Sequence, residues 1–527
     1  MHPVEMFELV LGMLIAILVL HWAAEQLRWP PSVALLIGGG ALAFIPGIPT
    51  IHIDPELVLV LFLPPLLMDG AWNTALVHFR RHFVGILSLA VGAVIFTTLV
   101  VAVVAHWLMP SLPWAACAAL GAIVAPPDAV SARSVLQRVE LPRRLSTLIE
   151  GESLLNDATG LVIFRFAVAA AMGSGFDAGA AVGQFAMLAI GGTLVGLAVG
   201  MLWVLIARAV RDELLQVVMS VLVGWTSYLI AEQLHVSGVL ATVTAGLVLG
   251  WYQHTIFTAA VRMKGTSFWI VLVFLLEASV FMLIGFSLRD ILERAGGIEV
   301  VLQQMAWPVL AIVLSLTVAR LAWIMGSDFL LQALSKAGLH RNEPLGLPAG
   351  LVMGWAGMRG VVTLAVALTL PETMPGRDFM LVTAFGVILV TVVLQGSTLG
   401  LLIRLTGLKR TKADAPPMTM AVAEASMIKA QLTEVEKHAH DADGKLIHPQ
   451  LLARYSRHAA AAEKFSGSPD ERAQDIKAHF DVVIAASIAG RAELVRLHRL
   501  HLIDDETLLS LEHDLDLQEL AAISAKE

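Results

Sequence analysis

Charged residues are scarce in this sequence. Asp, Glu, Lys and Arg make up 15% of its 527 residues, whereas a soluble globular chain averages about 25%. The stretches 84–108 and 180–207 contain none of the four, and each is longer than the ~20 apolar residues that cross a bilayer. The composition therefore excludes an ordinary soluble protein and indicates an all-helical, polytopic membrane protein.

Cysteine is almost absent, and no Lys or Arg leads the first apolar run. The single Cys117 excludes a disulfide framework and most thiolate metal sites, and we interpret it as a small packed residue. Glu5 precedes the first apolar run at 9–24, and no small-x-small cleavage site follows that run. We therefore expect the run to be the first membrane span rather than a signal peptide, and we expect no bound cofactor.

The net charge of −8 belongs to one end of the chain. After position 412 there are 20 acidic and 12 basic residues, which leaves 23 of each in the rest. This acidity argues against a nucleic-acid partner. Helix formers with regular apolar spacing follow Ala415-Pro416-Pro417. We expect a transmembrane domain at 1–412 and a helical cytoplasmic domain at 413–527 that regulates or stabilises a dimer.

Apolar runs and their breakers predict about thirteen spans. They lie at 5–25, 31–48, 55–72, 83–109, 113–136, 143–172, 179–209, 213–234, 237–253, 266–290, 304–334, 347–370 and 378–406. Lys and Arg gather in the loops that follow odd-numbered spans, as at Arg80, Arg138, Arg208 and Lys409. Because basic loops stay in the cytoplasm, we expect the N-terminus outside and the tail inside, in a bacterial inner membrane.

Two of these spans contain helix breakers in matching positions. Ala125-Pro126-Pro127-Asp128-Ala129 interrupts the fifth span, and three glycines within 354–360 weaken the twelfth. If spans 1–6 and 8–13 are inverted repeats, both breaks fall in corresponding spans, which is how many transporters build a binding site. A simple kink in each helix is the alternative. We expect crossed broken helices in which Asp128 offsets positive helix ends and Arg359 negative ones.

The sixth span places two carboxylates in an apolar run, within Gly151–Asp157. An ionisable side chain costs about 2.5–3.5 kcal/mol at bilayer depth, so we expect the chain to use them. Ser153 and Asp157 share one helical stripe, and Glu152 and Asn156 share the next. Alkali cations bind oxygen ligands, which Asp157, Ser153 and the backbone at Pro127 and Asp128 would supply.

These residues predict unequal roles. Asp157 would hold one proton or one cation but not both, which gives one-for-one, electroneutral exchange. Asn156 would either orient Asp157 or clamp the unwound helix. We interpret Glu152 as half of a structural ion pair. Glu277 and Arg320, which also lie in apolar runs, could pair with each other or with the crossing.

Several motifs in order resemble one family. Gly151–Asp157 resembles the Asn-Asp signature of the sodium/proton exchangers, the NhaP-type branch of the monovalent cation:proton antiporters. Leu63–Asp69, Ser237–Gly246, Glu277–Gly285 and Gly357–Gly360 resemble this family's motifs in the third, ninth, tenth and twelfth spans. The resemblance implies a homodimer, a six-helix core that moves against a dimerisation domain, Asp157 as the ion- and proton-binding carboxylate, and an ion pair between Glu152 and Arg359.

One position departs from the family. Pro127 stands where the family has a threonine, so a hydroxyl that can help to bind the ion is missing. The resemblance implies a Na+/H+ antiporter, and the missing hydroxyl makes K+/H+ exchange by the same mechanism the alternative. A cation channel would need a continuous polar pore, whereas the polar residues here cluster near one depth. No catalytic motif points to an enzyme. The expected partners are membrane lipid, a second copy of the chain and the transported cation.

Overall fold

Helices form every regular element that the structure describes in this chain. The computed structural model describes residues 3–27, 29–46, 55–128, 141–173, 178–336, 345–408, 418–440, 445–465 and 469–526. These residues divide between two compact units, Met1–Thr411 and Lys412–Glu527. The domain boundary predicted at 412/413 falls within 409–417, outside the described residues.

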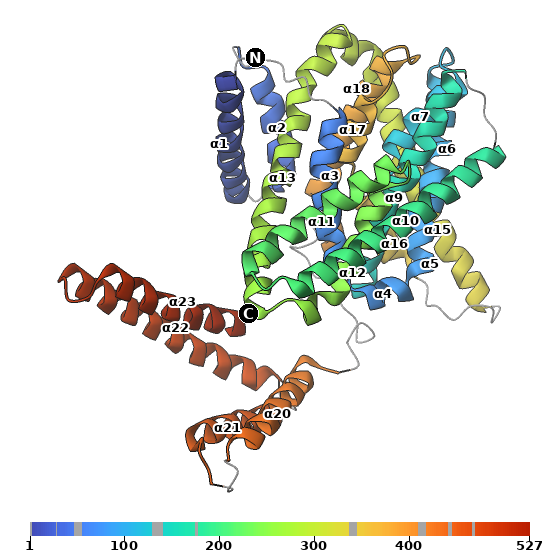
Figure 1. Cartoon of the computed structure of the whole chain (residues 1–527). Helices are drawn as coiled ribbons and strands as arrows, with labels where there is room; N and C mark the ends of the chain where they lie inside the picture. Colours follow the sequence, from blue (N-terminus) through green and yellow to red (C-terminus); the bar gives the residue numbers. More distant parts are fainter. Residues whose placement is uncertain are drawn as a thin grey trace. The chain divides into compact units, whose positions relative to one another are not determined.

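The first unit is a bundle of apolar helices (Figure 1). In chain order its helices are α1 Pro3–Leu27, α2 Pro31–Ala43, α3 Pro55–Trp72, α4 Leu76–Arg81, α5 Phe83–Leu87, α6 Val94–Leu108, α7 Trp114–Val124, α9 Arg143–Ala171, α10 Ala178–Ala209, α11 Glu213–Gln233, α12 Gly238–Ile256, α13 Ala259–Arg294, α14 Ile298–Val300, α15 Ala306–Lys336, α16 Leu347–Trp355, α17 Val361–Leu368, α18 Arg377–Val390 and α19 Gly396–Thr406. Three π-helical turns join neighbouring helices: η1 Ser88–Ala93, η2 Val301–Met305 and η3 Thr391–Gln395.

The predicted spans agree with these helices. Each of the thirteen predicted ranges contains helix in the described residues. Eight helices there are at once long and apolar enough to cross a membrane, and Pro31–Ala43 and Trp114–Val124 are shorter apolar helices. The fold is thus a polytopic helical bundle as expected, and the number of thirteen crossings stays a prediction.

Side-chain caps mark the two weakest boundaries between spans. The Asp212 carboxylate accepts a hydrogen bond from the Leu215 amide at 2.8 Å, which begins α11 directly after α10. The Ser237 hydroxyl accepts from the Leu240 amide at 3.3 Å and begins α12. An N-cap oxygen satisfies one of the amides that the first helical turn leaves without a partner. These local signals separate helices whose apolar runs are almost continuous.

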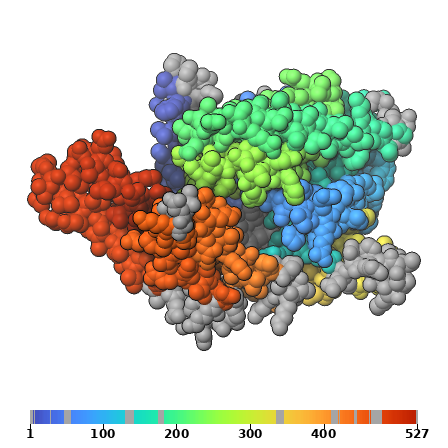
Figure 2. Space-filling model, turned by 60° about the horizontal axis from the view of Figure 1, so that its bottom comes forward, coloured from blue at the N-terminus to red at the C-terminus, as the bar shows by residue number. Residues whose placement is uncertain are grey.

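Two groups of helices pack within this unit. α10 and α3 pack on α12, and α2 packs on α13, whereas α7 packs on α6 and α9, and α15 on α6 and α16. Figure 2 shows α10, α11 and α12, in shades of green, as one continuous surface along one side of the unit. A buried cluster from α7, α13, α17 and α18 and a second from α3, α9 and α16 form most of the core.

The second unit contains two helical hairpins. α20 Met420–His438 packs on α21 Pro449–Phe465, and α22 Pro469–Arg499 packs on α23 Asp505–Lys526. Arg491 of α22 contacts Asp516 and Glu519 of α23 at 2.6 Å each. Because these charges are partly solvated, their main effect is to fix the register of the hairpin rather than to stabilise it strongly. The predicted helical character of the tail agrees with this description.

Candidate functional site

Two helices are interrupted and meet at their breaks. α7 ends at Val124, and Ala125–Asp128 continues without helical structure. α16 ends at Trp355, and α17 begins again at Val361. The Asp128 amide donates to the Met358 carbonyl at 2.8 Å, so the two breaks are hydrogen-bonded directly. Both predicted interruptions are therefore confirmed, except that Ala129 lies outside the described residues.

Arg359 closes the end of the first broken helix. Its Nε donates to the Val124 carbonyl at 2.8 Å, its Nη2 to the Ala125 carbonyl at 2.9 Å, and its Nη1 to the Gly357 carbonyl. The last carbonyls of a helix have no partner within it and carry partial negative charge. The guanidinium group, which is 1% exposed, therefore offsets a negative helix end, as the sequence predicted.

The predicted ion pair between Glu152 and Arg359 is wrong. Glu152 instead pairs with Arg320 of α15, whose Nη1 and Nη2 lie 2.5 and 2.8 Å from its two carboxylate oxygens. This fork-to-fork arrangement is the strongest geometry for such a pair. The guanidinium nitrogens of Arg359 donate to backbone carbonyls. Arg320 instead lies on α15, which packs on α16.

Arg320 also links this pair to the crossing. Its Nη2 donates to the Met353 carbonyl at 3.3 Å, near the end of α16. Of the two alternatives for Arg320, partnership with Glu277 or with the crossing, the structure thus has the second. Glu277 lies half-buried on α13. Glu152 is 1% exposed and Arg320 is 3% exposed. Each side chain therefore neutralises the other's buried charge, which would destabilise the fold if it were unpaired.

Asn156 holds the first break in place. Its Nδ2 donates to the Pro127 carbonyl at 2.5 Å, and the side chain is fully buried. Pro126 and Pro127 cannot donate backbone hydrogen bonds, so the chain at the break depends on side chains for part of its hydrogen bonding. Of the two roles predicted for Asn156, the structure has the clamp on the unwound helix. Its Oδ1 has no hydrogen-bond partner within the described part of the chain.

Asp157, Ser153 and Asp128 line one small cavity. Its volume is about 50 Å³, and Asp157 is 7% exposed. Glu150 lines the same cavity, and so do Leu63, Leu66, Leu67 and Gly70 of α3, Leu154 of α9, and Val361 and Val362 of α17. The predicted ligands Asp157, Ser153 and Asp128 therefore come together at one cavity, whereas Asn156 and Pro127, which are hydrogen-bonded to each other, are not among its lining residues. Glu152 is not among the lining residues.

The Asp128 carboxylate packs against Gly360, where there is no side chain. A Cβ atom at position 360 would overlap an oxygen of that carboxylate. Gly360 is the residue before α17, whose first amides have no partner within the helix and carry partial positive charge. Asp128 thus lies at a positive helix end, as predicted, and only glycine leaves room for it.

Two residues of this site were not predicted. The Thr391 hydroxyl accepts from the Arg359 amide at 3.1 Å and donates to the Val387 carbonyl at 2.7 Å, so it holds the second break as Asn156 holds the first. A threonine in an apolar helix gives no sequence signal for this role. Glu150 did have a signal, because 150, 153 and 157 follow the spacing of one helical face.

The wall opposite α9 is a helix with two prolines. Pro64 and Pro65 lie inside α3, and Pro65 has no amide with which to bind the Leu61 carbonyl. The Trp225 indole of α11 donates to that carbonyl at 3.3 Å. A side chain from a neighbouring helix thus replaces the missing backbone bond, which is how membrane helices tolerate proline.

Two interrupted helices that cross beside buried carboxylates define a secondary ion transporter. The chain belongs to the sodium/hydrogen exchanger family, because the family model for the sodium/hydrogen exchanger transmembrane region matches residues 3–405. It is therefore a multi-pass membrane protein of a cation/proton antiporter family.

Relatives and solved structures agree with this assignment. The chain is 30% identical to YjcE of Escherichia coli, described as an uncharacterized Na+/H+ exchanger, over 90% of this chain and 91% of that one. It is 32% identical to a sodium, potassium, lithium and rubidium/H+ antiporter of Bacillus pumilus, over 71% and 57% of the two chains. The sodium proton antiporter MjNhaP1 of Methanocaldococcus jannaschii has the same fold, with a TM-score of 0.61, 20% identity and coverage of 76% and 100%.

Proposed function

We propose that this protein is an electroneutral Na+/H+ antiporter that exchanges one cation for one proton by alternating access. In this proposal both ions compete for Asp157. The observation that carries it is the pairing of the other buried charges around the crossing. Arg320 neutralises Glu152, and Asp128 and Arg359 contribute opposite charges at the crossing. Asp157 is then the carboxylate of this site whose charge a bound proton or a bound cation cancels in turn.

The cavity supports this role because its polar groups are oxygens. Asp157, Ser153 and Asp128 face a volume of about 50 Å³, a few times the ~10–15 Å³ that one water molecule needs. The Pro127 carbonyl accepts one hydrogen bond from Asn156 and has a second lone pair for a cation. Glu150 is exposed and lines the same cavity, so it would attract cations towards Asp157.

K+/H+ exchange by the same mechanism is the second candidate. Pro127 lacks the hydroxyl of the family's threonine, which leaves fewer ligands to strip water from a small cation. A relative 32% identical to this chain is named for sodium, potassium, lithium and rubidium together. The ion preference of this chain is thus best tested with both cations in parallel.

We also propose the setting of this activity. The basic loops support an N-terminus outside and a tail in the cytoplasm, and the setting that we propose is a bacterial inner membrane. The family resemblance supports a homodimer surrounded by lipid. No catalytic step or resident cofactor enters the mechanism, in which the transported Na+ or K+ and the proton are the only ligands.

Transport by reconstituted protein tests the proposal. Proteoliposomes with an acidic interior should lose their pH gradient when Na+ is added outside. The rate should be unchanged when valinomycin and K+ clamp the membrane potential at different values, because no net charge moves. Asp157→Asn should reduce exchange at least a hundredfold, because an amide cannot alternate between a proton and a cation. Repeating the measurement with K+ as the driving cation decides the preference.

A matched variant controls for protein quality. Asp378→Asn removes an exposed carboxylate from the first turn of α18 and should exchange at the wild-type rate. Exchange by Asp157→Asn at that rate would contradict the central assignment. A rate that follows the clamped potential would contradict electroneutrality, and a conductance far above turnover rates would indicate a channel.

A further inference from the structure

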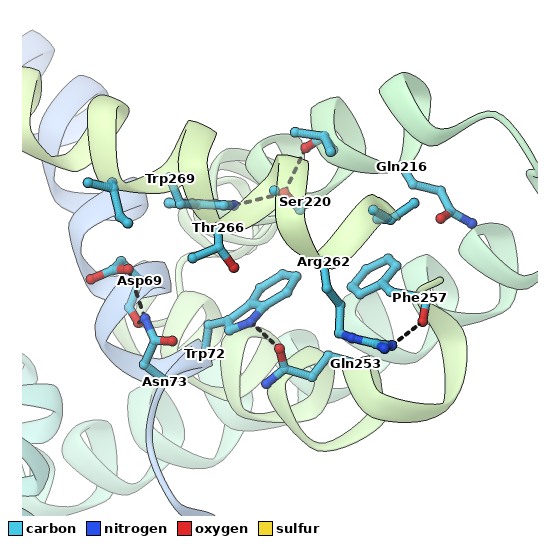
Figure 3. A pocket seen from close by; sticks show the side chains of 14 residues that line it. Asp69, Trp72, Asn73, Gln216, Ser220, Gln253, Phe257, Arg262, Thr266 and Trp269 are labelled. Carbon is cyan, nitrogen blue, oxygen red and sulfur yellow. Dashed lines mark hydrogen bonds between the residues drawn. The ribbon is translucent and has the colours of Figure 1, made fainter. Parts of the chain in front are cut away.

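A second and larger cavity lies apart from the ion site. Its volume is about 140 Å³, and it is formed by the end of α3, the beginnings of α11 and α13 and the end of α12 (Figure 3). It shares no lining residue with the cavity at Asp157. Nothing in the exchange mechanism uses it.

Aromatic rings with fixed positions make up its walls. The rings of Trp72 and Phe257 stack with centroids 5.7 Å apart and planes 2° from parallel, and Trp269 lies 6.4 Å from Trp72. The Trp72 indole donates to the Gln253 amide oxygen at 2.7 Å, and the Trp269 indole donates to the Ser220 hydroxyl at 2.9 Å. Because each indole nitrogen already has a partner in the wall, the cavity is preformed.

Opposite charges line this aromatic pocket. Arg262 of α13 donates through Nη1 to the Phe257 carbonyl at 2.5 Å, which leaves further donors of its guanidinium group for a ligand. The Asp69 carboxylate of α3 accepts from the Asn73 amide at 2.9 Å and lines the pocket, and a carboxylate can accept several hydrogen bonds at once. Figure 3 shows Asp69 and Arg262 on opposite sides of the Trp72 indole.

The pocket lies at helix ends that the sequence predicts to face the cytoplasm. Arg208, Arg211 and Lys264 belong to the basic loops at the same helix ends, which are the loops expected in the cytoplasm. Trp and Arg are typical of this boundary. Ile270 lines the pocket and is 66% exposed, and the next residue, Val271, is 57% exposed. An apolar surface on α13 therefore begins at the pocket.

We propose that this pocket binds the headgroup of a membrane phospholipid that carries both a phosphate and a primary amine. The phosphate pairs with Arg262, the ammonium group pairs with Asp69 across the Trp72 ring, and the acyl chains leave along Ile270 and Val271. The volume is roughly ten times that needed for one water molecule, which accommodates a phosphate linked to a short amine.

The charges that line the pocket favour this headgroup over the common alternatives. An anionic headgroup without an amine would place its hydroxyl groups, with no positive charge, against the Asp69 carboxylate. A choline headgroup is positive but has no N–H to donate to that carboxylate. Aromatic rings favour a cation over their faces, so Trp72 adds to the preference for the ammonium group.

Binding to the purified full-length protein tests the proposal. Phosphatidylethanolamine, phosphatidylglycerol and phosphatidylcholine with the same acyl chains are titrated in detergent, and bound lipid is counted by native mass spectrometry. We expect phosphatidylethanolamine to bind at least fivefold more tightly than the other two. Arg262→Gln should weaken it about tenfold. Asp69→Asn, which keeps shape and size, should remove the preference for phosphatidylethanolamine over phosphatidylglycerol.

Arg211→Gln is the matched control, because it removes the same charge from the same helix ends without touching the pocket. It should bind phosphatidylethanolamine as the wild type does. Equal binding of the three lipids by the wild type, or undiminished binding by both pocket variants, would overturn the proposal. Soluble glycerophosphoethanolamine distinguishes the source of the headgroup: if it displaces the lipid at equal concentration, the ligand is a soluble metabolite and the lipid assignment fails.

Discussion

At the scale of single residues, the two buried arginines should respond differently to the loss of Glu152. Arg320→Met leaves Glu152 buried without its partner, which should cost about 3–5 kcal/mol of stability. Glu152→Leu together with Arg320→Met replaces the whole pair with apolar groups and should recover most of that loss. Thermal unfolding of the four proteins of this double-mutant cycle measures the coupling.

The same cycle between Glu152 and Arg359 is the control. Because Arg359 binds backbone carbonyls at the end of α7, Glu152→Leu should not rescue Arg359→Met. A coupling energy larger for Arg359 than for Arg320 would show that the ion pair has been assigned to the wrong arginine.

The sequence predicts which charged residues belong to the site, but it does not predict which carboxylate forms an ion pair with which arginine. Helical periodicity placed Ser153 and Asp157 on one face, and the structure brings both to one cavity. Periodicity says nothing about which neighbouring helix a face meets, and Arg320 and Arg359 are both single arginines in apolar runs. The pairing follows from the packing of α15 against α16, and so does not show in the spacing of residues along either helix.

At the scale of elements, the sequence predicts where helices are interrupted, but it does not predict the side-chain contacts between helices. The prolines at 126 and 127 and the glycines at 354–360 end helices through local chemistry, so their positions follow from the sequence. The hydroxyl of Thr391 holds the second break only because α18 and η3 lie beside it. That contact depends on tertiary structure, as does the indole bond from Trp225 that supports α3.

Three glycines on α10 form a close tertiary contact with α12 that mutation can test. Gly192, Gly196 and Gly200 recur every four residues and face Ser237, Ala241 and Ala245 of α12, the small-residue spacing that lets membrane helices approach closely. A Cβ at position 196 would overlap the Ala241 carbonyl oxygen. Gly196→Ala should therefore force the two helices apart and lower the thermal midpoint of the purified protein by several degrees.

Gly183→Ala on the same helix is the control for Gly196→Ala. A Cβ at position 183 meets nothing within 4 Å, and alanine favours a helix by up to ~1 kcal/mol over glycine. Its midpoint should be unchanged or slightly raised. Equal losses in both variants would mean that helix propensity, and not the contact between α10 and α12, governs stability here.

At the scale of the whole molecule, the distribution of charge gives the orientation. The net charge of −8 lies beyond position 412, and the basic residues of the membrane part gather in alternate loops. The rule that basic loops stay in the cytoplasm needs an odd number of crossings to place both the N-terminus outside and the tail inside. Orientation and an odd number of crossings, as in the predicted thirteen, are thus one hypothesis, which a single labelling experiment tests.

Cysteine accessibility can decide this because the chain has only Cys117, which is fully buried. In a Cys117→Ala background, Ser111→Cys lies between the predicted fourth and fifth spans, and Ser510→Cys lies on exposed α23. In intact cells a membrane-impermeant maleimide should label Ser111→Cys and leave Ser510→Cys unlabelled, and inverted membrane vesicles should give the reverse. Labelling of both from the same side would require an even number of crossings between them, which would contradict the nine spans predicted there and reverse the orientation of one end.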